Sequence, residues 1–241
     1  MYICCEINKK IHIQDVIDLE TKIKGSSPKG YREFITKFGP GELNSFIFLM
    51  SPLQIESTAN EWQDILLNKS YTNPMFPLKL RKEAFVFAYS IDFDIFAFHP
   101  KKNQIYCLSG HSEEIFCTGE SVFEMIDWSL FSGAFYPRHT QSYFQPECRR
   151  MHRLYSVSNP PDMINFEQAL ASLGQEDCKI IEFYSIHIFY FKWGAKITYS
   201  IKHSELSLSF DKEYALLLSP ILDDLLSKML FTQTEEYFSE V

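Results

Sequence analysis

Two cysteine and histidine pairs in the sequence have a spacing that could serve chemistry: Cys107 with His111, and Cys148 with His152. A thiol and an imidazole that meet in a fold can bind zinc or act as a nucleophile and its base. A structural zinc site needs four ligands, and neither pair is accompanied by a second pair at zinc-finger spacing. We therefore predict free thiols, no metal and no cofactor. An enzyme that uses Cys107 or Cys148 with a histidine stays open as an alternative.

Other catalytic motifs are missing from the sequence. It contains no GxSxG, no HExxH, no dinucleotide fingerprint and no glycine-rich phosphate loop. The segment Gly39-Pro40-Gly41 is too short, and too interrupted by proline, to hold a phosphate. The prediction is a protein that is not an enzyme and has no catalytic residues.

Acidic side chains are the stronger candidates for function. Asp92 and Asp94 fall in one predicted turn between strands, and Glu113 and Glu114 fall in another. Because these loops bound adjacent strands, we expect the four carboxylates to form one patch. Clustered carboxylates speed the encounter with a basic protein and exclude wrong partners. The predicted partner-binding residues are therefore Asp92, Asp94, Glu113 and Glu114.

The composition is that of a folded, acidic protein. Of 241 residues, 46% are hydrophobic and 16% aromatic, which argues against extended disorder. The formal net charge of -8 argues against a nucleic-acid partner, because neutralising phosphates needs a basic surface, and it favours a basic protein partner. No apolar run approaches the roughly 20 residues that cross a bilayer, and Glu6, Lys9 and Lys10 interrupt the start. We expect a cytoplasmic protein that does not enter a membrane, and its oligomeric state is left open.

The elements that position these residues begin with two helices. Apolar residues at helical spacing predict helices over 14–24 and 28–38. Ser27 is expected to cap the second helix, Pro28 to begin it and Gly39 to end it.

A strand within 42–50 should follow, and then a helix opened by a capping box of Thr58 and Glu61. Beyond it the pattern changes to the alternation of strands, with Phe85, Phe87 and Tyr89 expected on one face of the first strand. The predicted strands cover 84–90, 95–99, 104–108 and 114–118. Because these strands are consecutive, the prediction is an α+β fold, a mainly antiparallel sheet with helices packed on it.

A closing helix should run from Ser121 to Gly133 with Phe123 inward, which completes a domain over 1–136. Residues 137–161 are locally basic and contain Pro160-Pro161, so they are predicted to be a connector. Residues 162–241 should form a second, smaller α+β unit of a helix, three to four strands and a helix.

In that second unit Asn165 is expected to cap the first helix and Ser219-Pro220 to open the last one. The acidic tail from Thr232 is expected to fray.

Taken in this order, residues 13–133 resemble the SUKH superfamily, which includes the fungal cell-wall-synthesis regulators and many bacterial toxin-immunity proteins. The resemblance lies in a proline-led helix of the form L-P-x-x-Y-x-x-F-[IL], a glycine turn, a tryptophan segment and a closing helix that starts S-F-x-x-F-[IL]. The corresponding segments are Ser27-Pro28-Lys29-Gly30-Tyr31-Arg32-Glu33-Phe34-Ile35, Gly39-Pro40-Gly41-Glu42-Leu43, Trp62, and Ser121-Val122-Phe123-Glu124-Met125-Ile126. Ser27 replaces the family's leucine, and Pro40 splits its glycine pair. Where the family has glycine-aspartate before a middle strand, this chain has Asp92-Phe93-Asp94.

The resemblance implies a non-enzymatic immunity protein that binds a cognate bacterial toxin, such as a nuclease, and neutralises it by stoichiometric occlusion. A toxin that grips nucleic acid is basic, which fits the acidic charge of this chain. A regulatory or scaffolding interaction module, as the fungal relatives imply, is the first alternative. The cysteine-dependent enzyme is the second.

Overall fold

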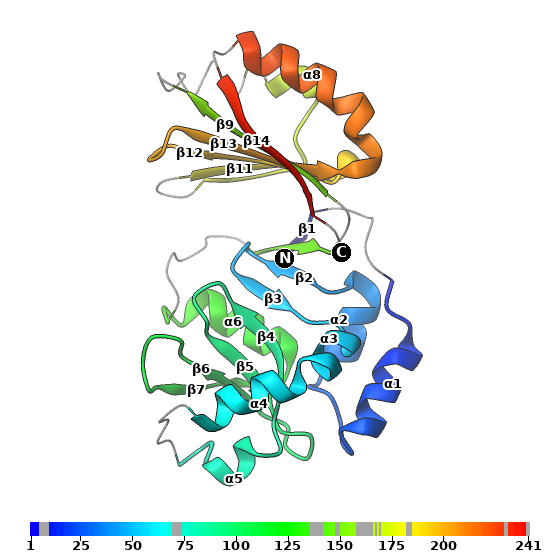
Figure 1. Cartoon of the computed structure of the whole chain (residues 1–241), viewed down its shortest axis with the longest axis vertical. Helices are drawn as coiled ribbons and strands as arrows, with labels where there is room; N and C mark the ends of the chain where they lie inside the picture. The colour runs from blue at the N-terminus through cyan, green and yellow to red at the C-terminus, as the bar shows by residue number, and fades with distance from the viewer. Residues whose placement is uncertain are drawn as a thin grey trace. The chain divides into compact units, whose positions relative to one another are not determined.

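The computed structural model describes residues 1–4, 10–68, 74–134, 142–147, 150–157, 166, 168, 170–181, 185–228 and 231–239. The chain forms two compact units, one of Asn8–Pro146 and one of Met1–Ile7 with Glu147–Val241 (Figure 1). The fold is α+β, with two antiparallel sheets and helices packed on them, as the sequence predicts.

The unit of Asn8–Pro146 is a sheet with helices on both faces. Its helices are α1 (Ile13–Lys22), α2 (Tyr31–Phe38), α3 (Pro52–Ser57), α4 (Ala59–Asn68), α5 (Leu78–Arg81) and α6 (Val122–Phe131). Its strands are β2 (Gly41–Leu43), β3 (Ile47–Leu49), β4 (Phe85–Ser90), β5 (Ile95–Phe98), β6 (Ile105–Leu108), β7 (Ile115–Gly119) and β8 (Tyr143–Pro146). They lie in the order β8-β2-β3-β4-β5-β6-β7, with neighbours antiparallel.

Aromatic contacts show how the two faces of this sheet are covered. On one face Trp62 of α4 packs on Tyr89, with ring centroids 5.4 Å apart. On the other face Trp128 of α6 packs on Phe116 at 5.5 Å. With both faces covered, every residue of β5 and β6 is buried. These central strands therefore read as continuous apolar runs.

A bulge in β4 changes which aromatic side chains share a face. Val86 pairs with Ala97 and Ala88 pairs with Phe96, so Phe87 is an extra residue without a ladder partner. Such a bulge reverses the alternation of faces, which puts Phe85 and Tyr89 on opposite sides of the sheet. The prediction that Phe85, Phe87 and Tyr89 share a face was wrong.

Helix α2 begins three residues later than the sequence pattern indicates. The Ser27 backbone and hydroxyl both donate to the Glu20 carboxylate, the hydroxyl at 2.6 Å, so the side chain binds α1 and caps no helix. The carbonyl of Lys29 accepts a hydrogen bond from the Val122 backbone N–H at 2.9 Å, which keeps this segment extended. Gly30 then leads into the helix, which ends at Gly39 as predicted.

A capping box lies at Ser51 and not at Thr58, where the sequence predicts one. Ser51 accepts from the Gln54 backbone, and the Gln54 side chain accepts from the Ser51 backbone, with Pro52 in the first turn. Thr58 instead ends α3 and donates its hydroxyl to the Gln54 carbonyl at 2.7 Å, so the Thr58 and Glu61 box is wrong.

Two other elements of this unit differ from expectation. The strand expected within 42–50 is a hairpin of β2 and β3, turned at Asn44 and Ser45, which both have positive φ. Phe123, expected inward on α6, is about half exposed, while Ser121 caps that helix as predicted.

The second unit is a sheet with its helices on one face. Its sheet consists of β9 (Arg150–Val157), β10 (Cys178–Ile181), β11 (Ser185–Tyr190), β12 (Ala195–Ser200), β13 (Glu205–Asp211) and β14 (Phe231–Ser239). The unit also includes β1 (Tyr2–Ile3), which is not a strand of this sheet. The sheet order is β10-β11-β12-β13-β9-β14. Helix α8 (Ala215–Lys228) and three short 3₁₀ turns, η1 (Ala171–Leu173), η2 (Phe191–Trp193) and η3 (Lys212–Tyr214), complete the described elements. Alternate residues of β12 and β13, such as Ile197, Tyr199 and Leu208, form its core.

Three predictions for this part of the chain were wrong. The expected connector over 137–161 contains β8 and β9, one strand in each sheet. Helix α8 begins at Ala215, so Pro220 lies inside it. The expected frayed tail is β14, which pairs along β9 from Phe231↔Val157 to Ser239↔Arg150. The predicted cap Asn165 lies outside the described residues.

Candidate protein-binding surface

Asp94 joins the two loops that carry the predicted partner-binding residues. Its carboxylate accepts a hydrogen bond from the Ser90 hydroxyl at 2.6 Å and from the Gly110 backbone N–H at 2.9 Å. Asp94 is only 6% exposed. A buried carboxylate is stable when such donors satisfy it, so this side chain fixes the loops and presents no charge to a partner. The structure therefore removes Asp94 from the predicted patch.

The two loops approach each other closely at Gly110. A β-carbon added to this glycine would lie 2.1 Å from the Asp92 carbonyl oxygen, so only glycine fits. Asp92, Glu113 and Glu114 are exposed on these loops. The structure thus brings together the loops of the three remaining carboxylates.

Phe93, which the sequence reasoning missed, is the most unusual residue of these loops. It is 75% exposed and has a φ of 64°, in the left-handed region that favours glycine. Ile91, two residues earlier, is also exposed. The sequence held one signal that could have identified Phe93: an aromatic residue between two aspartates in a short turn. We call Ile91, Asp92, Phe93, His111, Glu113 and Glu114 the paired-loop surface.

Of the two cysteines considered as nucleophiles, the structure describes only Cys107. Cys107 is buried, and burial together with nearby Asp94 raises the pKa of its thiol well above the usual value, so it stays protonated at neutral pH. Cys148 lies outside the described residues. Burial, then Arg150 and Lys196, lower the pKa of His152. Within the part of the chain that the structure describes, no three His, Cys, Asp or Glu side chains gather in a group that could hold a metal ion.

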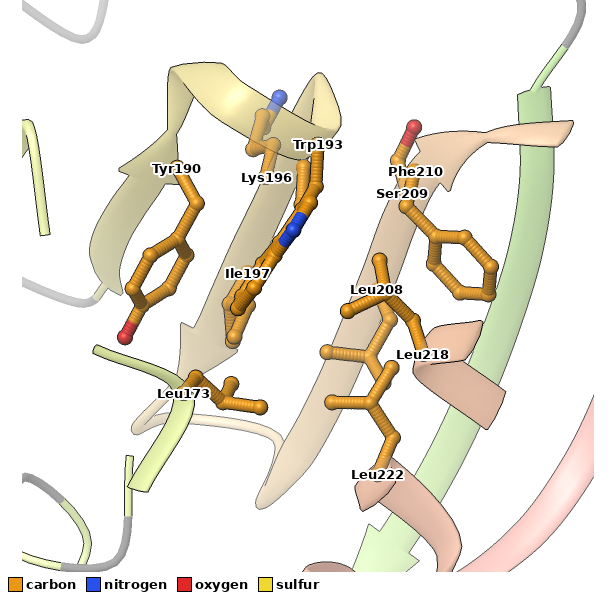
Figure 2. Close-up of a pocket in the computed structure, with 11 residues that line it drawn as sticks. Leu173, Tyr190, Trp193, Lys196, Ile197, Leu208, Ser209, Phe210, Leu218 and Leu222 are labelled. Carbon is orange, nitrogen blue, oxygen red and sulfur yellow. The ribbon is translucent and has the colours of Figure 1, made fainter. Parts of the chain in front are cut away.

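A hollow in the second unit lies between the sheet and α8 (Figure 2). Trp193 and Ile197 form one side of it, and Leu208 and Leu218 the other. Its cavity volume is about 10 Å³, room for about one water molecule. Ligand pockets run from roughly 300 to 1,000 Å³ and carry a few convergent polar groups. We interpret this small, largely apolar hollow as a packing gap.

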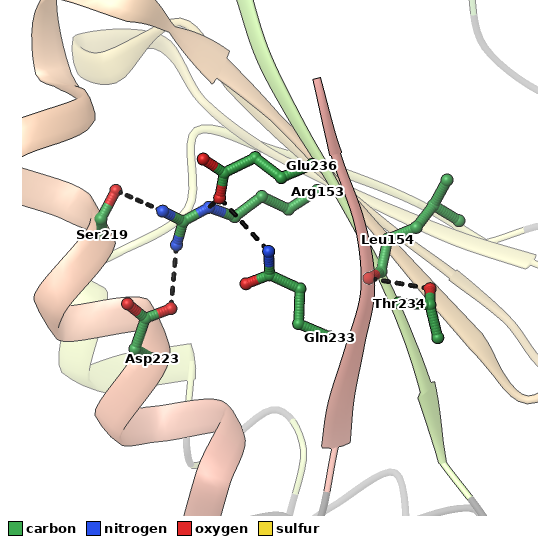
Figure 3. A network of polar contacts seen from close by, with 7 residues as sticks. All are labelled: Arg153, Leu154, Ser219, Asp223, Gln233, Thr234 and Glu236. Carbon is green, nitrogen blue, oxygen red and sulfur yellow. Dashed lines mark hydrogen bonds and ion pairs between the residues drawn. The ribbon is translucent and has the colours of Figure 1, made fainter. Parts of the chain in front are cut away.

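A buried arginine forms the main polar network of the second unit (Figure 3). Arg153 of β9 lies 2.8 Å from Asp223 and donates to the Ser219 hydroxyl at 2.9 Å, both on α8. Its Nε lies 2.7 Å from a carboxylate oxygen of Glu236 on β14. Arg153 thus bonds side chains of α8 and β14, which accounts for its burial as a structural one. The network therefore fastens α8 and β14 to the sheet.

None of the helices in the described residues has the length and apolar character needed to cross a membrane. Comparison with protein-family models, with curated proteins and with solved structures gave no match.

Proposed function

We propose that this protein is a non-enzymatic immunity protein that acts in the cytoplasm and uses the paired-loop surface to bind a basic toxin. The supporting observation is that Asp92, Glu113 and Glu114 are exposed on two loops which Asp94 and Gly110 hold together. The resemblance of residues 13–133 to the SUKH superfamily supports the toxin as the class of partner.

The proposed mechanism is occlusion of the toxin. A toxin that binds nucleic acid must carry a basic surface for phosphates. The carboxylates of the paired-loop surface attract that surface over about a Debye length, roughly 8 Å at physiological ionic strength, and speed productive encounters. Once bound, the protein occupies the surface on which the nucleic acid would lie, so neutralisation is one to one.

The test uses the purified product of the adjacent gene, because an immunity gene is expected beside its toxin gene. The variant Asp92→Lys/Glu113→Lys/Glu114→Lys should slow association by at least about tenfold at low salt and flatten its salt dependence. The control Glu61→Lys/Asp64→Lys/Asp127→Lys makes the same change of charge at exposed residues on α4 and α6. It should alter the association rate much less.

Two results would overturn the proposal. If the adjacent gene product does not bind, the protein is not its immunity partner. If both triple variants slow association equally, only net charge matters and the paired-loop surface is not the binding site.

A further inference from the structure

We infer that Phe93 is the aromatic anchor of the paired-loop surface and inserts into an apolar pocket of the partner whose rim carries Lys or Arg side chains. This inference rests on the proposed function, because it assumes a basic protein partner. It adds the chemistry of the contact, which the exposed carboxylates alone do not specify.

The conformation of Phe93 supports this role. A left-handed conformation is unfavourable for any residue with a β-carbon, and glycine would adopt it without strain. Burial of the ring cannot compensate for that cost, because the side chain is 75% exposed. A strained, solvent-facing aromatic residue contributes nothing to the fold that glycine would not. Such backbone outliers persist mainly where function needs them.

Backbone hydrogen bonds hold the turn around Phe93, so the side chain leaves the backbone in a defined direction. The Phe93 backbone N–H donates to the Ser90 carbonyl at 3.1 Å, and the Ser90 N–H donates to the Asp94 carbonyl at 2.9 Å. Ile91 is tied to the neighbouring hairpin by a bond from its N–H to the Phe46 carbonyl at 3.0 Å. A turn that is already ordered loses little backbone freedom on binding, which favours affinity.

The charges around Phe93 define the partner it fits. Asp92 adjoins it in sequence, and Glu113 and Glu114 lie on the loop that meets the Asp92 backbone. The ionisable side chains of the paired-loop surface are these three carboxylates and His111. Interface anchors are typically apolar side chains in pockets, surrounded by a polar rim that excludes water. A complementary surface must therefore offer an apolar pocket with basic residues around it.

The experiment measures binding of the adjacent gene product to Phe93→Ala and to Phe131→Ala, a matched control. Phe131, on α6, is 77% exposed, close to the value for Phe93. Phe93→Ala should raise Kd roughly 30-fold, mostly through faster dissociation, as expected for a buried aromatic anchor. Phe131→Ala should leave Kd within about twofold of wild type. Unchanged melting temperatures would confirm that both variants fold.

Phe93→Trp gives a second, direct readout. It should retain binding, and its added tryptophan emission, taken as the difference from wild type, should shift to the blue when the indole enters the pocket. Wild-type affinity of Phe93→Ala, or emission from Phe93→Trp that does not move on binding, would overturn the inference.

Failure of the anchor and failure of the proposed function are distinguishable. Slower association of the triple charge variant with normal dissociation of Phe93→Ala would leave the acidic surface as the site and exclude the anchor. Faster dissociation of Phe93→Ala with no effect of the charge variant would leave the anchor and exclude electrostatic recruitment. No binding of wild type would overturn both.

Discussion

Asp94 and Phe93 are neighbours in the chain with opposite roles. Asp94 faces inward and bonds Ser90 and Gly110, so it stabilises the two loops. Phe93 faces solvent in a left-handed conformation, so it destabilises them. Strain held in place by buried hydrogen bonds is typical of binding sites, where presentation of a side chain outweighs local stability.

Phe93→Gly should make the protein more stable while weakening binding. Relief of the left-handed strain is worth about 1–2 kcal/mol, and the extra freedom of glycine in the unfolded chain costs about 0.5–1 kcal/mol. We expect the free energy of unfolding in urea to rise by about 0.5–1 kcal/mol. A loss of stability instead would mean that the exposed ring supports the fold and that its conformation has a structural cause.

The site could be predicted only in part from the sequence. The adjacency of the two loops followed from the hairpin pattern, because neighbouring strands must end near each other. The burial of Asp94 depends on a bond to Gly110, 16 residues away, which no local pattern encodes. The left-handed conformation of Phe93 contradicts the preference of its residue type, so propensity pointed away from it.

Elements were predicted correctly where their own sequence defines them. The β5–β6 hairpin and the end of α2 at Gly39 follow from alternation, turn residues and glycine. The errors arose where contacts between elements determine the structure. Ser27 binds Glu20 of α1, and β14 pairs with β9 across about 80 residues. The acidic composition of the tail predicted fraying. It gave no sign that Glu236 pairs with the buried Arg153 of β9.

The position of the α3 cap can be tested with two single substitutions. Ser51→Ala should lower the free energy of unfolding by about 1 kcal/mol, because the Gln54 N–H loses its acceptor. Thr58→Ala removes only a hydroxyl donor at the end of that helix, so it should cost clearly less. Urea denaturation of both variants measures the two losses of unfolding free energy. A larger loss for Thr58→Ala would support a capping box of Thr58 and Glu61 instead.

Arg153→Met should loosen β14 from the sheet. The change removes the cation that bonds α8 and β14, and we expect a loss of about 2 kcal/mol, since Asp223 and Glu236 can still reach water. Hydrogen exchange should accelerate for the backbone amides of β14. The control Thr234→Ala removes one exposed hydrogen bond between the same strands and should have a smaller effect. Equal exchange rates in Arg153→Met and wild type would show that backbone pairing alone holds this strand.

The contact between α1 and the start of α2 should make stability depend on acid pH. Burial alone would raise the pKa of Glu20, but hydrogen bonds from Ser27 and the charge of Arg32 lower it below the usual 4.5. The stabilisation is therefore present above pH 4.5 and is lost as pH falls through the lower, folded pKa. Glu20→Gln should be less stable than wild type at pH 7, and the difference should shrink below pH 4.5. A difference that stays constant in acid would exclude Glu20 as the titrating group.

In the proposed function, the net charge of -8 and the acidic loops act together when the chain meets a partner. Net charge contributes an attraction without direction, whereas the carboxylates of the paired-loop surface steer the partner toward the bound orientation, and salt screens both effects. A general attraction, shared by all acidic residues, is therefore distinct from the proposed directed one, which belongs to three carboxylates and one aromatic ring.

Association rates against ionic strength test this separation most directly. For wild type and the adjacent gene product, we predict a rate that falls steeply with added salt, and a much flatter dependence for Asp92→Lys/Glu113→Lys/Glu114→Lys. The Glu61→Lys/Asp64→Lys/Asp127→Lys control should keep most of the wild-type slope. Equal slopes for the two triple variants would contradict the claim that the paired-loop surface recruits the partner.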